Sequence, residues 1–485
     1  MLSPTELRYP GPFQSSNWYL VQVSKNLYPA FRDGHAHPLF AGREALGPEV
    51  SNLKSVDEIV LEVKKWAEQN SGDWIVGGAY DRSLAPSFMA SWLDSAVPDR
   101  PVVLHASDHH TIWVNSEALR RAGVLESFPA VTIGHADLDE AGRPTGTLRE
   151  SGAMEVVLSN IPPRTLADEL KALDWAQEKM LSVGITQVQD AWIEPGMAEI
   201  YLEALDSDRL AVATNLAFRI TPENYEKDYE YFQNLRAEIA NRNSPLLTLK
   251  TAKFFADGVF GSGTASVLDP YLDGGHGEPV WDERLLQKAT AKYAEAGYQL
   301  HIHAIGDAAV RSSLDAIENC GSTELPSVIT HAELVNQEDV LRFAKLGVIA
   351  NFQPLWAKPD SMLLSCKHWL GEDRLEQMYA LRTFIDSGVK VSFGSDWPVS
   401  SNNPLLGIQT AVTREYEGKI LAPKQRITLS EALYSYTAAV TEQLGGSISE
   451  EQIALSHKLE DLEPHELGEV RVEAVFRGVE TIWES

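Results

Sequence analysis

Strand-like and helical segments alternate along most of this 485-residue chain. Short apolar runs that predict buried strands recur after residue 165, and helical segments such as 283–296 and 337–346 separate several of them. The predicted strands lie at residues 185–188, 212–218, 246–255, 298–303, 327–331, 347–352 and 390–393. An opening strand that begins within residues 27–31 brings the total to eight. Alternation of this kind is typical of a parallel sheet covered by helices.

Eight strands favour an α/β fold, and specifically a closed (β/α)8 barrel of the TIM type. In such a barrel the functional side chains gather at the C-terminal ends of the strands. An open doubly wound sheet is the alternative. That fold usually carries a glycine-rich phosphate-binding loop after its first strand, and the sequence has none there. We therefore expect the barrel.

A long segment interrupts the alternation early in the chain. Residues 40–160 contain their own strand-like runs at 73–78 and 101–105, each bounded by turn residues. We expect this segment to be a large insertion after the first strand, within a barrel that spans residues 29–444. Because loops at a barrel mouth often set specificity, the insertion is predicted to be a lid or specificity subdomain.

The regular part of the chain is predicted to begin with a helix. Thr165 and Asp168 resemble an N-terminal capping signature, leucines follow at roughly helical spacing, and Gly184 ends the helix.

The two ends of the chain, residues 1–28 and 445–485, are expected to form a small β appendage. Strand-like runs lie at 18–23, 470–476 and 479–483, and the last two flank a turn at Arg477 and Gly478.

Polar side chains lie at the ends of several predicted barrel strands. His35 and His37 are two residues apart, so in a strand both would point to the same face. Two adjacent imidazoles are the start of a metal site, although an isolated pair is weak evidence. The other strand-end groups are Lys253, His301, His303, His331 and Asp396. Each has an ordinary alternative as a solvated lysine, a core histidine or a turn aspartate, but their convergence at one end of a barrel favours a metal centre.

These motifs resemble those of the amidohydrolase superfamily, and specifically its third family, the YtcJ-like metal-dependent hydrolases. The matching motifs are DGHAH at 33–37, KFFADG at 253–258, HAIGD at 303–307, THAE at 330–333 and GSDWP at 394–398. Two further stretches, DHHTIWVNS at 108–116 and PTGTLRE at 144–150, also resemble family signatures. The resemblance extends from about residue 28 to residue 440.

The resemblance implies a set of metal ligands. They are His35, His37, His303, His331 and Asp396. Asp396 would also act as the general base. Lys253 matches a position that many relatives carboxylate with carbon dioxide to bridge two metals, so it joins the expected ligands. His301 lies deeper on the same strand as His303, and we assign it a structural role.

The expected cofactor is zinc, as one or two divalent ions, because zinc suits imidazole and carboxylate ligands. A metal-activated water would attack the carbonyl of an amide, formamide or cyclic amide. Asp396 would take the proton of the water and pass it to the leaving nitrogen. A non-hydrolytic lyase or isomerase on the same barrel and an inactive binding protein are the alternatives.

Five further residues are candidates for substrate binding: His110, Trp113, Gln353, Trp356 and Trp397. His110 lies in the insertion, where a surface histidine is the ordinary alternative. Tryptophans are also common in ordinary cores and at rims.

Composition limits the partners. The formal net charge is -28, which opposes binding to nucleic acid or to anionic lipid and favours small-molecule substrates. The start shows no basic segment followed by an apolar one, and no apolar stretch is long enough for a bilayer, so a cytoplasmic location is expected. Cys320 and Cys366 are predicted to be free thiols. A homo-oligomer is left open.

Overall fold

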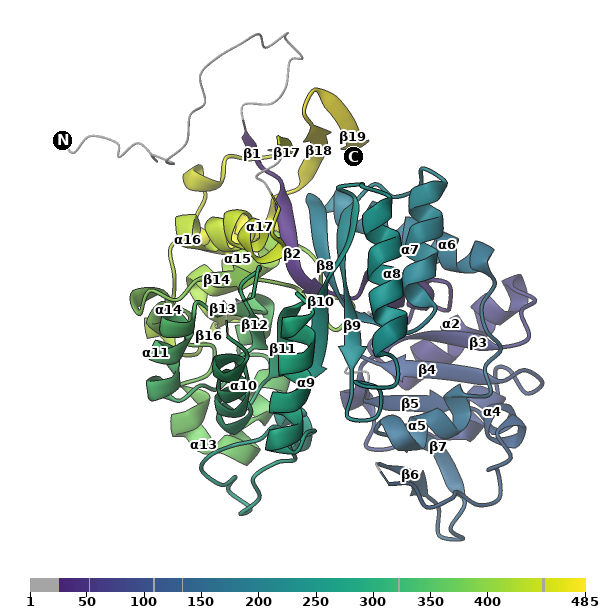
Figure 1. The fold of residues 1–485 in the computed structure, drawn as a ribbon. Helices are drawn as coiled ribbons and strands as arrows, with labels where there is room; N and C mark the ends of the chain where they lie inside the picture. Colours follow the sequence, from purple (N-terminus) through teal and green to yellow (C-terminus); the bar gives the residue numbers. More distant parts are fainter. Residues whose placement is uncertain (1–25, 52, 108–109, 133, 322, 447–449) are drawn as a thin grey trace, which may run out of the picture.

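The computed structural model describes residues 26–485 except 52, 108–109, 133, 322 and 447–449. At its centre eight parallel strands form a nearly closed barrel, as predicted (Figure 1). The strands, in spatial order, are β14 (Val391–Phe393), β13 (Ile349–Phe352), β12 (Val328–His331), β11 (Gln299–Ala304), β10 (Leu247–Phe255), β9 (Ala213–Ile220), β8 (Ile185–Ile193) and β2 (Phe31–Ala36).

The first and last strands of the barrel meet just beyond the end of β14. The amide of Asp396 donates to the carbonyl of His35 at 2.7 Å, and the amide of His37 donates to the carbonyl of Trp397 at 2.7 Å. These two hydrogen bonds join the N-terminal and C-terminal parts of the barrel at its mouth.

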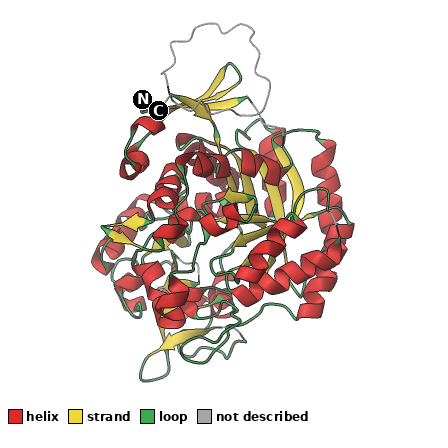
Figure 2. Cartoon of the chain, turned by 90° about the vertical axis from the view of Figure 1, so that its left-hand side faces the viewer, coloured by secondary structure: helices red, strands yellow, loops and turns green. Residues whose placement is uncertain are grey.

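Helices cover the outside of the barrel (Figure 2). They include α6 (Leu166–Ser182), α7 (Met197–Asp206), α8 (Tyr229–Asn241), α9 (Glu283–Glu295), α10 (Asp307–Cys320), α11 (Gln337–Leu346), α14 (Leu381–Asp386), α15 (Pro404–Thr413), α16 (Leu429–Ser435) and α17 (Ala438–Leu444). The predicted start of α6 is confirmed, because the hydroxyl of Thr165 accepts from the amide of Asp168 at 3.2 Å. Gly184 follows this helix with a φ of 79°, a conformation that suits glycine.

A large insertion follows the first barrel strand, as predicted. Helix α1 (Pro38–Ala45) leads from β2 into a second sheet with the order β3-β4-β5-β7-β6, in which only the β3–β4 pair is parallel. Its strands are β3 (Ile75–Tyr80), β4 (Val102–Ala106), β5 (Thr111–Val114), β6 (His135–Leu138) and β7 (Pro144–Arg149). Helices α2 (Val56–Gln69), α3 (Ala90–Asp94), α4 (Ser116–Arg121) and α5 (Ser151–Leu158) accompany this sheet.

The inserted sheet has its own hydrophobic clusters, one on each face. Leu104 and Trp113 belong to one cluster, and Val103 and Ile112 belong to the other. This alternation is expected for strands that are buried on both faces. The insertion is therefore cored independently of the barrel, beside which it lies (Figure 1).

A four-stranded antiparallel sheet packs against one end of the barrel (Figure 2). It consists of β1 (Leu27–Pro29), β17 (Glu451–Leu455), β18 (Val472–Arg477) and β19 (Glu480–Glu484). The predicted final hairpin is present, whereas β17 was not predicted. The strand predicted at 18–23 lies outside the described residues.

Two remaining properties concern the whole described chain. Cys320 and Cys366 are free cysteines, as predicted. Among the residues that the structure describes, none of the helices combines the length and the apolarity needed to cross a bilayer.

The four-stranded sheet is anchored to the barrel by one buried carboxylate. Glu451, on β17, accepts from the hydroxyl of Thr186 at 2.8 Å and from the side-chain Nε2 of Gln187 at 3.1 Å, both on β8. It also accepts from Nε of Arg477 at 2.9 Å. The side chain of Glu451 is only 4% exposed. Removing one member of such a buried network is costly because its partners keep their desolvated polar groups.

We therefore expect Glu451→Ala to lower the free energy of unfolding by about 2–3 kcal/mol. Denaturant titration measures this change. The matched control is Glu450→Ala at the neighbouring exposed position, where the change should stay within about 0.5 kcal/mol. Equal losses in the two variants would contradict the anchoring role of Glu451.

Candidate metal centre

Two histidines and one aspartate converge at the seam between β2 and β14. One Asp396 carboxylate oxygen, Oδ1, lies 2.8 Å from Nε2 of His37 and 3.2 Å from Nε2 of His35. All three side chains are buried, and one ligand atom from each lies within 4.8 Å of the others. A buried set of two imidazoles and a carboxylate is a donor set that suits a divalent transition metal.

The charge states of this group favour metal binding. Burial acts to raise the pKa of Asp396, but the adjacent His35 and His37 hold it well below its usual range, so the carboxylate stays ionised. Burial, with a contribution from Lys253, lowers the pKa of His35 to about 3. His35 is therefore neutral at physiological pH and offers a lone pair.

His303 and His331 lie beside this group at the ends of β11 and β12. Their ring centroids are 4.5 Å apart, and the ring of His331 is 5.0 Å from that of His35. The nitrogens of these two histidines are not part of the converged group of three. His303 donates from Nε2 to the carbonyl of Gly258 at 3.2 Å, which leaves Nδ1 as its lone-pair nitrogen.

His331 is held by two neighbours that the sequence had suggested as substrate-binding residues. Its Nδ1 donates to Oε1 of Gln353 at 2.7 Å, so Nε2 is the nitrogen that remains available to a metal. The ring of Trp356 stacks on that of His331 with an interplanar angle of 9°. Gln353 is fully buried. Both residues thus support a candidate ligand in the described structure.

Lys253 is fully buried, and its Nζ has no hydrogen-bond partner among the described residues. The ammonium group lies 4.7 Å from the centre of the Phe255 ring. Burial lowers the pKa of Lys253 to about 7, against the opposing charge of Asp396. A neutral amine is a nucleophile, and an orphaned one beside a candidate metal group fits the chemistry of carboxylation by carbon dioxide.

His301 supports His35 from the deeper position expected for a structural residue. Nδ1 of His35 lies 2.8 Å from Nε2 of His301, and His301 pairs in register with Lys253 on the neighbouring strand. If Nε2 of His35 holds a metal, then Nδ1 carries the proton and donates it to His301. Such a second partner fixes the tautomer and the orientation of a ligating imidazole.

The backbone turns sharply at two of the candidate ligands. His331 and Asp396 have φ angles of 73° and 56°, in the left-handed region that non-glycine residues rarely occupy. Each such residue costs about 1–3 kcal/mol, and such residues cluster at functional sites. At both positions the left-handed turn comes where a barrel strand ends.

Three buried aspartates near the site were not among the predicted site residues. Asp33 accepts from the amides of His35 and Ser395, each at 3.0 Å, and thus ties β2 to the end of β14. Asp190 accepts from the hydroxyl of Tyr201 at 2.6 Å. Burial raises the pKa of Asp190 to about 6, against the lowering effects of His37 and of the hydrogen bond from Tyr201.

The third aspartate, Asp257, accepts from the amides of Ser266, Ile305 and Gly306 and lies 3.5 Å from His303. It connects the loop after β10 to the loop after β11. Each of these aspartates lies just beyond a predicted strand or within one of the family-like motifs. The search for polar residues at strand ends, which identified Lys253, could therefore have identified them too.

The remaining suggested substrate residues lie in three different settings. Trp113 is fully buried in a hydrophobic cluster of the inserted sheet, and its indole donates to the carbonyl of Met89 at 3.0 Å. This placement puts Trp113 in a core rather than with the histidines. Trp397 is buried at the seam and stacks on Trp175. His110, with a side chain that is 38% exposed, pairs with Glu150.

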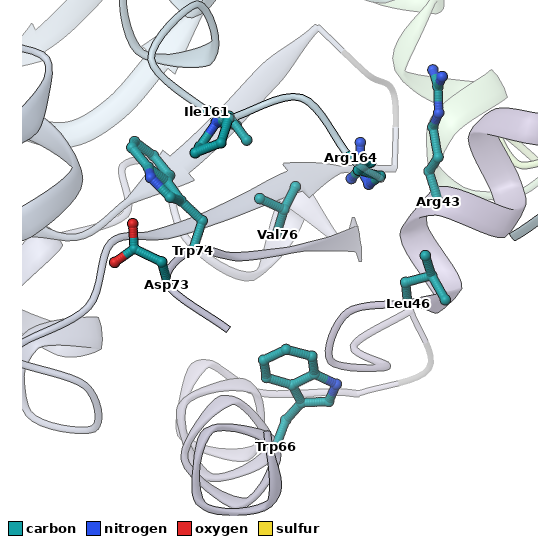
Figure 3. Close-up of a pocket in the computed structure, with 9 residues that line it drawn as sticks. Arg43, Leu46, Trp66, Asp73, Trp74, Val76, Ile161 and Arg164 are labelled. Atoms are coloured by element: carbon teal, nitrogen blue, oxygen red, sulfur yellow. The ribbon is translucent and has the colours of Figure 1, made fainter. Parts of the chain in front are cut away.

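A separate cavity of about 230 Å³ lies between α1 and the insertion (Figure 3). The aromatic rings of Trp66 and Trp74 and the side chains of Arg43 and Arg164 contribute to its lining. None of the predicted site residues lines it. The cavity marks the joint between the two independently cored parts, and the candidate metal centre lies elsewhere, at the barrel mouth.

Comparisons with known proteins add to this geometry. A family model described as "Amidohydrolase family" matches residues 25–447. The putative amidohydrolase YtcJ of Bacillus subtilis is 28% identical over 88% of this chain and 80% of its own length. The N-substituted formamide deformylase of Arthrobacter pascens is 26% identical over 85% of this chain and 78% of its own.

A solved structure is similar as well. An uncharacterized metal-dependent hydrolase from Pyrococcus furiosus matches with a TM-score of 0.68 and 26% identity, over 90% of this chain and 88% of that one.

The lowered pKa of Lys253 predicts a pH-dependent stability in metal-free, carbon-dioxide-free buffer. Between about pH 7 and pH 10.5 the unfolded chain binds a proton on Lys253 that the folded chain lacks, so this residue makes the protein more stable as pH rises. Relative to Lys253→Met, the free energy of unfolding of the wild type should therefore rise by about 1.4 kcal/mol per pH unit in this window.

Denaturant titrations at several pH values measure the difference. Lys250→Met, on the same strand but half-exposed, is the control for replacing a strand lysine. A constant difference between wild type and Lys253→Met would show that the ammonium group is not desolvated in the fold.

Proposed function

The chain belongs to the amidohydrolase family, and from that premise we propose that it is a metal-dependent hydrolase that cleaves a carbon–nitrogen bond of a small amide, formamide or cyclic amide. The observation that carries this proposal is the convergence of His35, His37 and Asp396 at the closing seam of the barrel. The similarity to an N-substituted formamide deformylase supports the formamide arm of the proposal.

The chain's own residues would divide the work of holding one or two zinc ions. His35, His37 and Asp396 form the inner group, and His303 and His331 approach from β11 and β12. Lys253, once carboxylated, would supply a further carboxylate ligand. Zinc bound in such a site lowers the pKa of water from about 15.7 to about 7 and polarises a substrate carbonyl.

Asp396 is the proposed proton acceptor. Its carboxylate is kept ionised by His35 and His37, and its backbone is fixed by the hydrogen bond to the carbonyl of His35. A carboxylate in this position can take the proton of the attacking water. Because the side chain is buried, bulk solvent is largely excluded from the transfer.

The direct test uses purified protein that is stripped of metal with a chelator and reloaded with zinc. Turnover is measured on a panel of simple amides, N-substituted formamides and cyclic imides, with the products identified by mass. We expect zinc to restore hydrolysis of at least one class to give a carboxylate and an amine. Failure of the zinc-loaded protein on the entire panel would count against the proposal, and eliminated or isomerised products would indicate a non-hydrolytic reaction instead.

The role of Asp396 makes a separate prediction. Asp396→Asn cannot accept the proton of water, so kcat should fall by about 10²- to 10⁴-fold in protein shown by elemental analysis to contain zinc. Asp373→Asn, at an exposed position of α13 (Lys367–Leu375), is the control and should retain full activity. Normal turnover in zinc-loaded Asp396→Asn would exclude this residue as the base.

A further inference from the structure

An arginine lies on the inner face of the barrel, on the strand next to Lys253. Arg219 is near the end of β9 and pairs in register with Lys253 on β10. Asn215 of the same strand donates to Thr251 inside the barrel, whereas the ring of Phe218 stacks on a ring of α8 outside it. Alternate residues of a strand share a face, so Arg219 lies on the inner face with Asn215.

Two aromatic rings hold the guanidinium of Arg219 beside the candidate metal centre. Its Cζ lies 4.7 Å from the ring centroid of Trp192 and 5.9 Å from that of Phe255. The ring centroid of Trp192 is 6.1 Å from that of His37, and the ring centroid of Phe255 is 5.0 Å from that of His303. Each ring that holds Arg219 therefore also contacts a candidate ligand.

The guanidinium of Arg219 has donors to spare. Nη1 donates to Oε1 of Glu194 at 3.0 Å, and the same oxygen accepts from the indole of Trp192 at 2.7 Å. Among the described residues this is the one hydrogen bond that the guanidinium makes, and Nε is buried without a partner. Nε and Nη2 share one edge of the planar group, and such an edge binds a carboxylate through two parallel hydrogen bonds.

Arg219 is accessible to a ligand, unlike its neighbour Lys253. The side chain of Arg219 is 35% exposed, whereas Lys253 is fully buried. Stacking on aromatic faces is a common structural use of arginine, but it provides no hydrogen bonds for the edge. A donor that is desolvated and unpaired is costly, and a ligand that accepts from it removes that cost.

We propose that the substrate carries a carboxylate and that Arg219 binds it. This inference rests on the proposed function and narrows its substrate class to N-acyl amino acids and related amides with an acidic group. With the scissile carbonyl at the metal centre and the carboxylate on the Nε–Nη2 edge, the substrate lies along Trp192 and Phe255. Glu194 is the positioning residue that fixes the opposite side of the guanidinium. The formal net charge of -28 offers anions no general attraction, so their recognition needs a local cation of this kind.

Matched pairs of substrates test the proposal. The acyl group that the panel identifies as best is placed on glycine, β-alanine and 4-aminobutyrate, and each acid is compared with its primary carboxamide. For at least one length, kcat/KM of the wild type should be about 10-fold or more higher on the acid than on the carboxamide. Arg219→Gln should lower this ratio by about 10- to 10²-fold, mainly through KM. A wild-type ratio near one at all three lengths, or equal losses on acid and carboxamide, would overturn the proposal.

Two further variants separate recognition from packing. Arg219→Lys keeps the charge but loses the planar fork, so it should retain only part of the wild-type ratio. Arg236→Gln is the control, because Arg236 also stacks on a ring, that of Tyr298 at 4.3 Å, but belongs to helix α8 outside the barrel. It should keep the wild-type ratio. An equal fall of the ratio in Arg236→Gln and Arg219→Gln would contradict a specific role for Arg219.

Binding to the zinc-free protein separates this inference from the proposed function, because no metal is then present to bind the carboxylate instead. Calorimetry compares the N-formyl acids with their carboxamides. Wild type should bind one acid about 10-fold more tightly than its carboxamide, and Arg219→Gln should lose this preference. If no panel member is hydrolysed but this preference is seen, the proposed function fails while Arg219 remains the anion-binding residue. If wild type hydrolyses the panel but shows no preference for the acids in rate or binding, only the present inference fails.

Discussion

The seam between the first and last barrel strands is the contact on which both the fold and the metal centre depend. Asp33 accepts from the amide and the hydroxyl of Ser395, and the amide of Asp396 donates to the carbonyl of His35. The same few residues therefore close the barrel and bring His35 within reach of Asp396, which is far away in sequence. The contacts that close the barrel also assemble the site, so a metal bound there would stabilise the closed barrel by binding only the folded state.

The interior beneath this seam is polar and well satisfied. Asn215 donates to Gln189, and Asn351 donates to Ser392, each across neighbouring strands. Buried polar groups are tolerated only when they are paired in this way. Nζ of Lys253 and one ring nitrogen each of His37 and His301 lack partners among the described residues, and so do a few buried groups elsewhere, such as the hydroxyl of Thr111 and the indole nitrogen of Trp281. The first three belong to the candidate site or touch it, and there a bound ligand would offset their cost.

The sequence predicted the features that follow from local rules. Short apolar runs located all eight barrel strands, and the search for polar residues at strand ends singled out His35, His37 and Asp396, which the structure brings together. Strand β17 was not predicted, although it pairs both with β1, more than 400 positions away, and with the predicted strand β18. Trp113 was placed with the substrate because a motif does not reveal which face of a sheet its residues occupy, and in the structure that face is a hydrophobic core.

The separate cores of barrel and insertion allow the two parts to change independently. The candidate metal ligands are fixed by barrel strands, whereas the inserted sheet is held by its own hydrophobic clusters. A cavity of about 230 Å³ lies at the joint between α1 and the inserted sheet (Figure 3). Substitutions that repack the insertion can therefore leave the candidate ligands undisturbed, because the two parts draw their rigidity from different sets of contacts.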